Sequence, residues 1–192
     1  MIIRQYKYTD FHAMMALFRK SFQHLYNQYE HQCSLADVQK TKKEGTMLVA
    51  VDGKRFLGFC GATTAGIVKS TQRYLSGRMD ESTGEVKAVK AGIAKRRDES
   101  GPILLEQFPH DFGPILPTDA YINVLAVETP RIGTGSALLS AIMDQHKAPR
   151  YFASCLSGSG SLELCTKYGY QPIVTAGPLF SSGHALTFVG RD

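Results

Sequence analysis

The sequence predicts a mixed α/β protein in which one central sheet is flanked by helices. Two observations lead to this prediction. Strand-like and helix-like segments alternate through the last third of the chain, and a hairpin signal, Asp52-Gly53, lies between two apolar runs further upstream. The chain has 192 residues, enough for one domain with a full hydrophobic core. We therefore expect a single domain over residues 1–192.

The N-terminal third should contain three strands and two helices. Residues 1–6 form a first strand, and strands at 47–51 and 56–63 flank the Asp52-Gly53 turn. Thr9 and Asp10 supply N-cap chemistry for a long helix. Its apolar stripe, which we interpret as core, consists of Phe11, Met14, Met15, Phe18, Phe22, Leu25, Tyr26 and Tyr29. Ser34 and Asp37 favour a second, short helix that ends near Gly45.

Residues 66–118 look like an insertion between the third and fourth strands. A polar stretch is followed by a basic, helix-like segment at 85–97 and then by four prolines that predict irregular structure. The helical segment is either a solvated amphipathic helix or a basic lid over an anionic ligand. The sequence leaves both interpretations open.

The C-terminal part should continue the sheet. We expect strands at 121–127, 151–156, 170–174 and 184–189. A helix that begins near Ala137 and is ended by Pro149 should follow the first of these strands. A shorter helix at 162–168 should follow the second and stop at Gly169.

Charge and cysteine usage narrow the function classes. The net charge of +5 and the pI of about 9.0 suit an anionic ligand, but the basic residues are too dispersed to favour nucleic acid. The four cysteines lack metal-finger spacing, so we expect reduced thiols and no metal. The absence of a leader-like start and of a long apolar run predicts a cytoplasmic protein that does not enter the membrane.

One turn carries the strongest functional signal. The strand that ends at Val127 leads into Gly133-Thr134-Gly135 and then into an apolar helix. Glycines let the backbone approach a ligand, and the first amides of a helix attract anions. Arg131 adds a charge, and Thr134 and Ser136 add hydroxyl donors. By itself the pattern is more typical of a tight strand–helix connection, because it lacks the remaining residues of a dinucleotide or P-loop fingerprint.

The order of several short motifs resembles the GNAT acetyltransferase superfamily. The matching segments are Leu125-Ala126-Val127, Gly133-Thr134-Gly135, Ala137-Leu138-Leu139 and Lys167-Tyr168-Gly169-Tyr170. The N-terminal strand, long helix and hairpin also match the opening of that family. The resemblance covers residues 1–64 and 118–192 and leaves the insertion unexplained.

The resemblance implies an N-acetyltransferase that uses acetyl-CoA as cosubstrate and transfers its acetyl group directly to an amine. The backbone of Leu125, Ala126 and Val127 would then contact the pantetheine arm, and an amide near Leu125–Ala126 would polarise the acyl carbonyl. The pyrophosphate would bind the amides of Arg131, Ile132, Gly133, Thr134, Gly135 and Ser136. The acceptor would be a small-molecule or peptide amine, which the sequence does not identify.

The catalytic residues are less well marked. The family's usual Arg or Gln position holds Pro130, and the position of its thiol-protonating tyrosine holds Cys165. Cys165 is therefore a candidate general acid, with core packing as the alternative. Strand alternation places Asn123 on one face with Tyr121 and Leu125, where it is a candidate for orienting a water. Further candidates for the general base are Glu128, Asp119, His110 and His184.

Two other functions remain open at this point. A GNAT-fold protein that binds CoA with weakened catalysis would be consistent with Cys165. An RNA-directed acyltransferase would use the basic insertion, although its basic residues are too few to favour nucleic acid. A homodimer is compatible with the sequence, which does not determine the oligomeric state.

Overall fold

The computed structural model describes residues 1–22, 24, 38–39, 41–64, 118–176 and 186–192. Almost the whole predicted insertion at 66–118 lies outside these ranges, as do the apolar positions 25–29 predicted for the first helix. The two interpretations of the basic segment at 85–97 therefore stay predictions.

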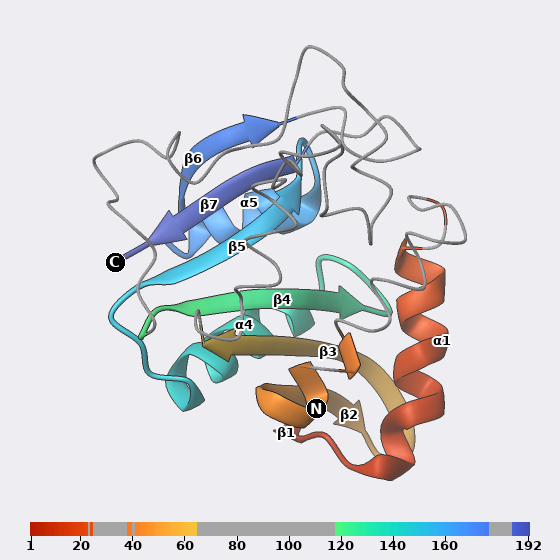
Figure 1. Cartoon of the computed structure of the whole chain (residues 1–192). Coiled ribbons are helices and arrows are strands. Elements are labelled where there is room, and N and C mark those ends of the chain that lie inside the picture. The colour runs from red at the N-terminus through yellow and green to blue at the C-terminus, as the bar shows by residue number, and fades with distance from the viewer. Residues whose placement is uncertain (23, 25–37, 40, 65–117, 177–185) are drawn as a thin grey trace, which may run out of the picture.

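The centre of the molecule is a seven-stranded mixed sheet with the strand order β1-β2-β3-β4-β5-β7-β6. Neighbouring strands are antiparallel except for β4 and β5, which are parallel (Figure 1). The strands are β1 (Ile2–Gln5), β2 (Thr46–Asp52), β3 (Arg55–Thr64), β4 (Ala120–Val127), β5 (Tyr151–Leu156), β6 (Gln171–Ala176) and β7 (Leu186–Arg191). This architecture confirms the predicted mixed α/β class.

Helices cover both faces of the sheet. The helix α1 (Phe11–Phe22) packs on one face, while α4 (Thr134–Gln145) and α5 (Gly160–Lys167) lie on the other. Figure 1 shows α4 and α5 behind the strands and α1 beside the ends of β3 and β4. In the described ranges, no helix has the length and apolar character needed to cross a membrane.

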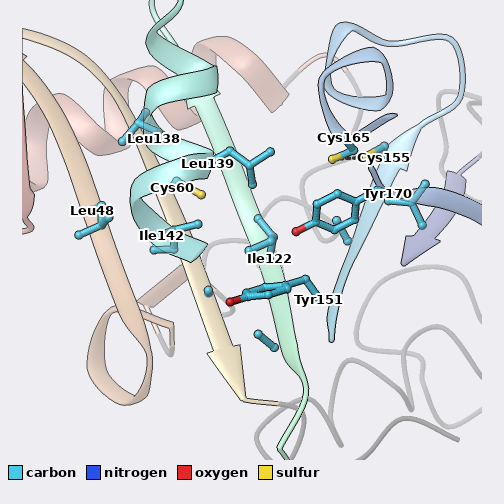
Figure 2. Close-up of a cluster of buried hydrophobic side chains, with 14 of the residues drawn as sticks. Leu48, Cys60, Ile122, Leu138, Leu139, Ile142, Tyr151, Cys155, Cys165 and Tyr170 are labelled. Atoms are coloured by element: carbon cyan, nitrogen blue, oxygen red, sulfur yellow. Dashed lines mark hydrogen bonds between the residues drawn. The ribbon is translucent and has the colours of Figure 1, made fainter. Parts of the chain in front are cut away.

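Each face has its own hydrophobic core, and the two cores meet the sheet from opposite sides. The α1 core includes Phe18, Phe59 and Val124, and all three are almost fully buried. The other core joins α4 to the strands and to α5 through residues such as Leu138, Ile142 and Tyr170 (Figure 2). Tyr170 is 1% exposed, and burial raises the pKa of its phenol. The apolar stripe predicted for the first helix is therefore core, as far as α1 extends.

The predicted hairpin is confirmed, and its turn has the expected physical cause. Strands β2 and β3 pair in antiparallel register through Asp52 and Arg55. Gly53 has a φ of +56°, a left-handed conformation that glycine adopts without steric cost. Before this hairpin in the chain, residues 38–39 and 41–44 are helical and Gly45 follows them. This agrees with the predicted end of the second helix.

Two details of helix capping differ from the prediction. The chain enters α1 through a short 3₁₀ turn, η1 (Tyr8–Asp10). The Asp10 carboxylate therefore accepts a hydrogen bond from the Lys7 amide at 2.7 Å, one turn before the expected cap. It also binds the Arg4 guanidinium through two hydrogen bonds, which lower the pKa of Asp10.

The second difference is that α4 ends at Gln145, so Pro149 follows the helix without ending it.

A buried ion pair fixes the start of the parallel junction between β4 and β5. Asp119, directly before β4, has a fully buried side chain, and Arg150, directly before β5, binds both of its carboxylate oxygens at 2.6 and 3.2 Å. The Ala120 amide also donates to the Arg150 carbonyl at 2.9 Å. Because two hydrogen bonds hold the guanidinium in plane, this pair sets the register at which the two strands begin.

Replacing Arg150 with methionine should destabilise the protein by about 3 kcal/mol, because it leaves the buried Asp119 carboxylate without its main charged partner. Urea unfolding followed by circular dichroism measures this change. The Lys20→Met variant is the matched control, since it breaks an exposed ion pair with Glu128 and should cost less than about 1 kcal/mol. Equal effects of the two substitutions would contradict this account of the junction.

Candidate active site

The strands β4 and β5 diverge beyond their shared start. Their register runs from Ala120–Tyr151 to Ile122–Ala153. After this point β4 continues to pair with β3 as far as Val127, and β5 continues to pair with β7 as far as Leu156. Figure 1 shows the two strands separating toward their C-terminal ends. Within the described ranges, the β5-facing edge of β4 from residue 123 onward therefore has backbone groups that β5 does not bind.

A β-bulge at Asn123 changes which side chains face each way. Gly61 opposes Val124 while Ala62 opposes Ile122, so Asn123 is the extra residue on β4. Beyond the bulge, Leu125 packs with the core on the α4 face, whereas Val124 belongs to the α1 core. The predicted alternation that placed Leu125 on one face with Asn123 is therefore wrong, because it assumed a regular strand.

The Asn123 side chain has a hydrogen-bonding task, as its polarity predicted. Its Nδ2 donates to Thr41 Oγ1 at 2.9 Å, and its Oδ1 accepts from Thr63 Oγ1 at 2.9 Å. Both threonines are buried, at 0% and 1% exposure. The amide thus joins β4 to β3 and to the helical segment before β2, which stabilises the bulge.

A second polar pair spans the two strands where they diverge. Tyr121 Oη and Ser154 Oγ lie 2.6 Å apart, with Tyr121 on β4 and Ser154 on β5. No motif in the sequence marked this contact, since the two residues are 33 positions apart and each is unremarkable in its own strand. This contact connects β4 to β5 near the end of the stretch in which the two strands are paired.

The turn after β4 has the backbone shape of an anion site. Arg131 has a φ of +64° and Gly133 a φ of +90°. A left-handed conformation costs a non-glycine residue on the order of 1 kcal/mol, and such strain is concentrated at functional sites. Both residues are exposed, and an added Cβ on Gly133 would meet open space. The turn therefore presents Arg131 to solvent beside the start of α4.

The first turn of α4 offers free backbone donors. Gly133 is its N-cap residue, and no side chain caps the helix. The first hydrogen bond in the helix runs from the Ala137 amide to the Gly133 carbonyl at 3.0 Å. The preceding amides of Thr134, Gly135 and Ser136 have no partner within the helix. No acidic residue stands in this turn, so nothing there opposes an anion.

The missing side chain of Gly135 makes room for neighbouring protein side chains and not for a ligand. A Cβ at this position would lie 3.3 Å from Leu164 Cδ2 and 3.7 Å from Val127 Cγ1. The glycine therefore lets the first turn of α4 pack closely against α5 and β4. Tyr168 strengthens this contact, because its hydroxyl donates to the Ser136 carbonyl at 2.8 Å. Neither role could be read from the sequence.

Cys165 is a buried residue of α5. It is 5% exposed, and its Sγ lies 3.6 Å from Cys155 Sγ. The contact with Cys155 and burial together raise the pKa of the Cys165 thiol. The position agrees with the packing alternative, while a role in proton transfer stays a prediction.

The other predicted acid–base candidates are engaged or lie elsewhere. Asp119 is held by Arg150, and Glu128 accepts a hydrogen bond from Lys20 at 2.6 Å, which joins α1 to the end of β4. His110 and His184 lie outside the described residues. In the described part of the chain, no group of three or more His, Cys, Asp or Glu side chains is placed to hold a metal ion.

Comparisons with known proteins identify the fold. No protein-family model matches the sequence, and no curated protein sequence matches it significantly. Solved structures do match over the full chain. A ribosomal-protein-alanine N-acetyltransferase from Brucella melitensis has a TM-score of 0.59 at 14% identity, with 100% of this chain and 99% of that chain covered.

Two further structures agree. A putative acetyltransferase from Salmonella typhimurium, solved with acetyl-CoA, has a TM-score of 0.60 at 14% identity, covering 100% of this chain and 92% of that one. A GNAT-family acetyltransferase from Bacillus cereus has a TM-score of 0.56 at 11% identity, covering 100% and 96%. This chain therefore has the GNAT acetyltransferase fold, as its motifs predicted.

The packing role of Gly135 yields a test that needs no ligand. Gly135→Val should destabilise the protein by about 2 kcal/mol, because the added methyl groups overlap with Leu164. Truncating the neighbour in the double variant Gly135→Val/Leu164→Ala should recover part of this loss, relative to Leu164→Ala alone, in chemical denaturation. If the two substitutions are simply additive, the glycine does not serve close packing against α5.

Proposed function

We propose that this GNAT-fold chain is an N-acetyltransferase that binds acetyl-CoA at the turn 131–136 and transfers the acetyl group to an amine. The observation that carries the proposal is the combination of a helix start without a side-chain cap and a neighbouring arginine held in a left-handed conformation. The fold supplies the context, since a structure that shares it was solved with acetyl-CoA.

The described residues fit the phosphate end of such a cosubstrate. The amides of Thr134, Gly135 and Ser136 point out of the start of α4, where the helix dipole favours negative charge. Arg131 adds a full positive charge from the adjoining turn, and Ile132 and Gly133 complete the exposed loop. We infer that these residues hold the pyrophosphate.

The separation of β4 from β5 fits the pantetheine arm. The β5-facing edge of Leu125, Ala126 and Val127 offers amide and carbonyl groups that β5 does not take. An extended, amide-containing arm bonds to such an edge as another strand would. Acetyl-CoA supplies a thioester whose acetyl group an amine attacks. A backbone amide near Leu125–Ala126 would stabilise the negative charge that develops on the acyl oxygen.

The transfer of protons during the reaction is assigned by excluding side chains that are buried or already hydrogen-bonded within the protein. A buried thiol with a raised pKa is a weak acid, so we propose that Cys165 mainly packs and that water protonates the leaving thiolate. Asn123 carries no basic group, and both ends of its amide are already bonded within the protein. We therefore propose that Asn123 positions the bulged strand, where it can also orient a water toward the acceptor amine.

One observation favours a second function. The buried Cys165 stands where the resemblance implies a tyrosine that protonates the leaving thiol, so catalysis by this chain would be slow. The alternative is a protein that binds CoA and transfers acetyl groups weakly. Turnover of acetyl-CoA with a panel of amines separates the two functions: binding without amine-dependent release of CoA supports the alternative.

CoA binding should depend on Arg131. Arg131→Asn should weaken CoA binding about tenfold in calorimetry, because it removes a charged hydrogen-bond donor. Asparagine tolerates the left-handed conformation, so the free energy of unfolding should not fall. Lys147→Asn is the matched control, since it removes a positive charge just beyond the opposite end of α4. Failure of the folded wild-type protein to bind millimolar CoA would sink the proposed function.

The proposed packing role of Cys165 predicts a small kinetic effect. Cys165→Ala should cost on the order of 1 kcal/mol of stability and leave kcat within a few-fold of wild type. A general acid would instead lose on the order of a hundredfold in rate. Cys155→Ala, which removes the contacting thiol, is the control. A large loss of kcat confined to Cys165→Ala, with CoA affinity intact, would identify this thiol as the acid.

A further inference from the structure

Two thiols lie in contact between β5 and α5. Cys155 and Cys165 are 4% and 5% exposed, and their sulfurs lie 3.6 Å apart as free thiols. Figure 2 shows the two side chains next to each other at the edge of the core, away from Cys60. The segment between them contains a turn in which Gly158 has a φ of +74°. Both side chains belong to the hydrophobic core, but the proposed reaction makes no use of the contact between the two sulfurs.

The pair is coupled to the start of α4 through the neighbours of Cys165 on α5. Directly before it, Leu164 fills the space that a Cβ on Gly135 would enter. Three residues after it, the Tyr168 hydroxyl donates to the Ser136 carbonyl. Leu164 and Tyr168 therefore link α5 to the first turn of α4 at Gly135 and Ser136. A change at Cys165 would be transmitted to these two residues.

We propose that Cys155 and Cys165 form a disulfide on oxidation by a peroxide, and that this bond weakens CoA binding at the start of α4. The second half of this inference rests on the proposed function. A disulfide bond is about 2.05 Å long, so the two sulfurs must approach by about 1.5 Å. Strand β5 is held by six paired residues of β7, whereas α5 is a helix of eight residues at the surface. The helix is therefore the part that moves.

The chemistry balances with peroxide as the oxidant. One cysteine, as thiolate, attacks a peroxide oxygen and becomes a sulfenic acid, while the other oxygen leaves as water after taking up a proton. The second cysteine, after losing its proton, attacks the sulfenic sulfur and forms the S–S bond; the hydroxide that leaves the sulfenic sulfur takes up this proton and becomes a second water. Two electrons pass from the thiols to the peroxide. Because both sulfurs are buried, the reaction requires local opening of α5.

The test compares reduced and peroxide-treated protein. Peptide mapping by mass spectrometry should find Cys155 linked to Cys165, with the loss of two hydrogen atoms. The dissociation constant for CoA should rise about tenfold, as expected when a hydrogen bond to a charged group is lost. Dithiothreitol should restore it. Cys155→Ala should show no change on oxidation, while the control Cys60→Ala should respond as wild type does.

Two results would overturn the inference: no link between Cys155 and Cys165 at peroxide concentrations that leave the protein folded, or a link that leaves CoA affinity unchanged. If reduced wild-type protein does not bind CoA, the proposed function fails instead. In that case, hydrogen exchange of the amides of Gly135 and Ser136 reports the coupling without ligand. Exchange rates that do not respond to the disulfide would overturn the coupling.

Discussion

The parallel junction of β4 and β5 is the constraint on which the rest of this structure depends. It is the one parallel contact in the described sheet, and it connects the N-terminal strands to the C-terminal ones. At its start, the buried Asp119–Arg150 pair and the first paired residues hold the strands together. Further along, among the residues that the structure describes, β4 pairs with β3 and β5 pairs with β7. The two strands are thus held together at one end and diverge toward the other.

The opening between the strands and the proposed anion site are produced by the same segment of chain. As β4 leaves β5, it runs directly into the turn that contains Arg131 and Gly133, and from there into α4. The first turn of α4 packs between β4 and α5 because Gly135 has no side chain. The free amides of the helix and the free edge of the strand are therefore neighbours in sequence. An elongated anionic ligand with an amide-rich arm matches this arrangement better than a compact anion does.

The polar groups around the junction serve structure as much as chemistry. Around the bulge, the Asn123 amide is hydrogen-bonded to Thr41 and Thr63. Where the strands diverge, Tyr121 is hydrogen-bonded to Ser154. Satisfied polar groups in a buried setting fix a single geometry. Under the proposed function the geometry separates two tasks: backbone groups would hold the cosubstrate, and side chains hold the strands that carry those groups. Cys165, a buried thiol, belongs to the second set in this view.

The sequence by itself determined the fold class, the hairpin, most strand positions and the presence of a glycine-containing turn between β4 and α4. These features depend on local properties: apolar periodicity, glycine at positive φ and the order of short motifs. The connection from β4 to α4 could be found because its glycines and Arg131 lie close together in the sequence, although α4 begins at Thr134, three residues before the predicted start. His110 and His184, and almost all of the 66–118 insertion, lie outside the residues that the structure describes, so the predictions made for them are unchanged.

Tertiary structure alone decided the face on which Leu125 lies, the packing role of Gly135 and the partners of Asn123, Tyr168 and Cys165. A bulge shifts alternation by one residue and is set by pairing with a distant strand, so it leaves no periodic signal. The contact between Tyr168 and Ser136 spans 32 positions, and that between Asn123 and Thr41 spans 82. Such contacts form only after strands and helices have packed, because side-chain type specifies what a residue can bind and the fold specifies what it meets.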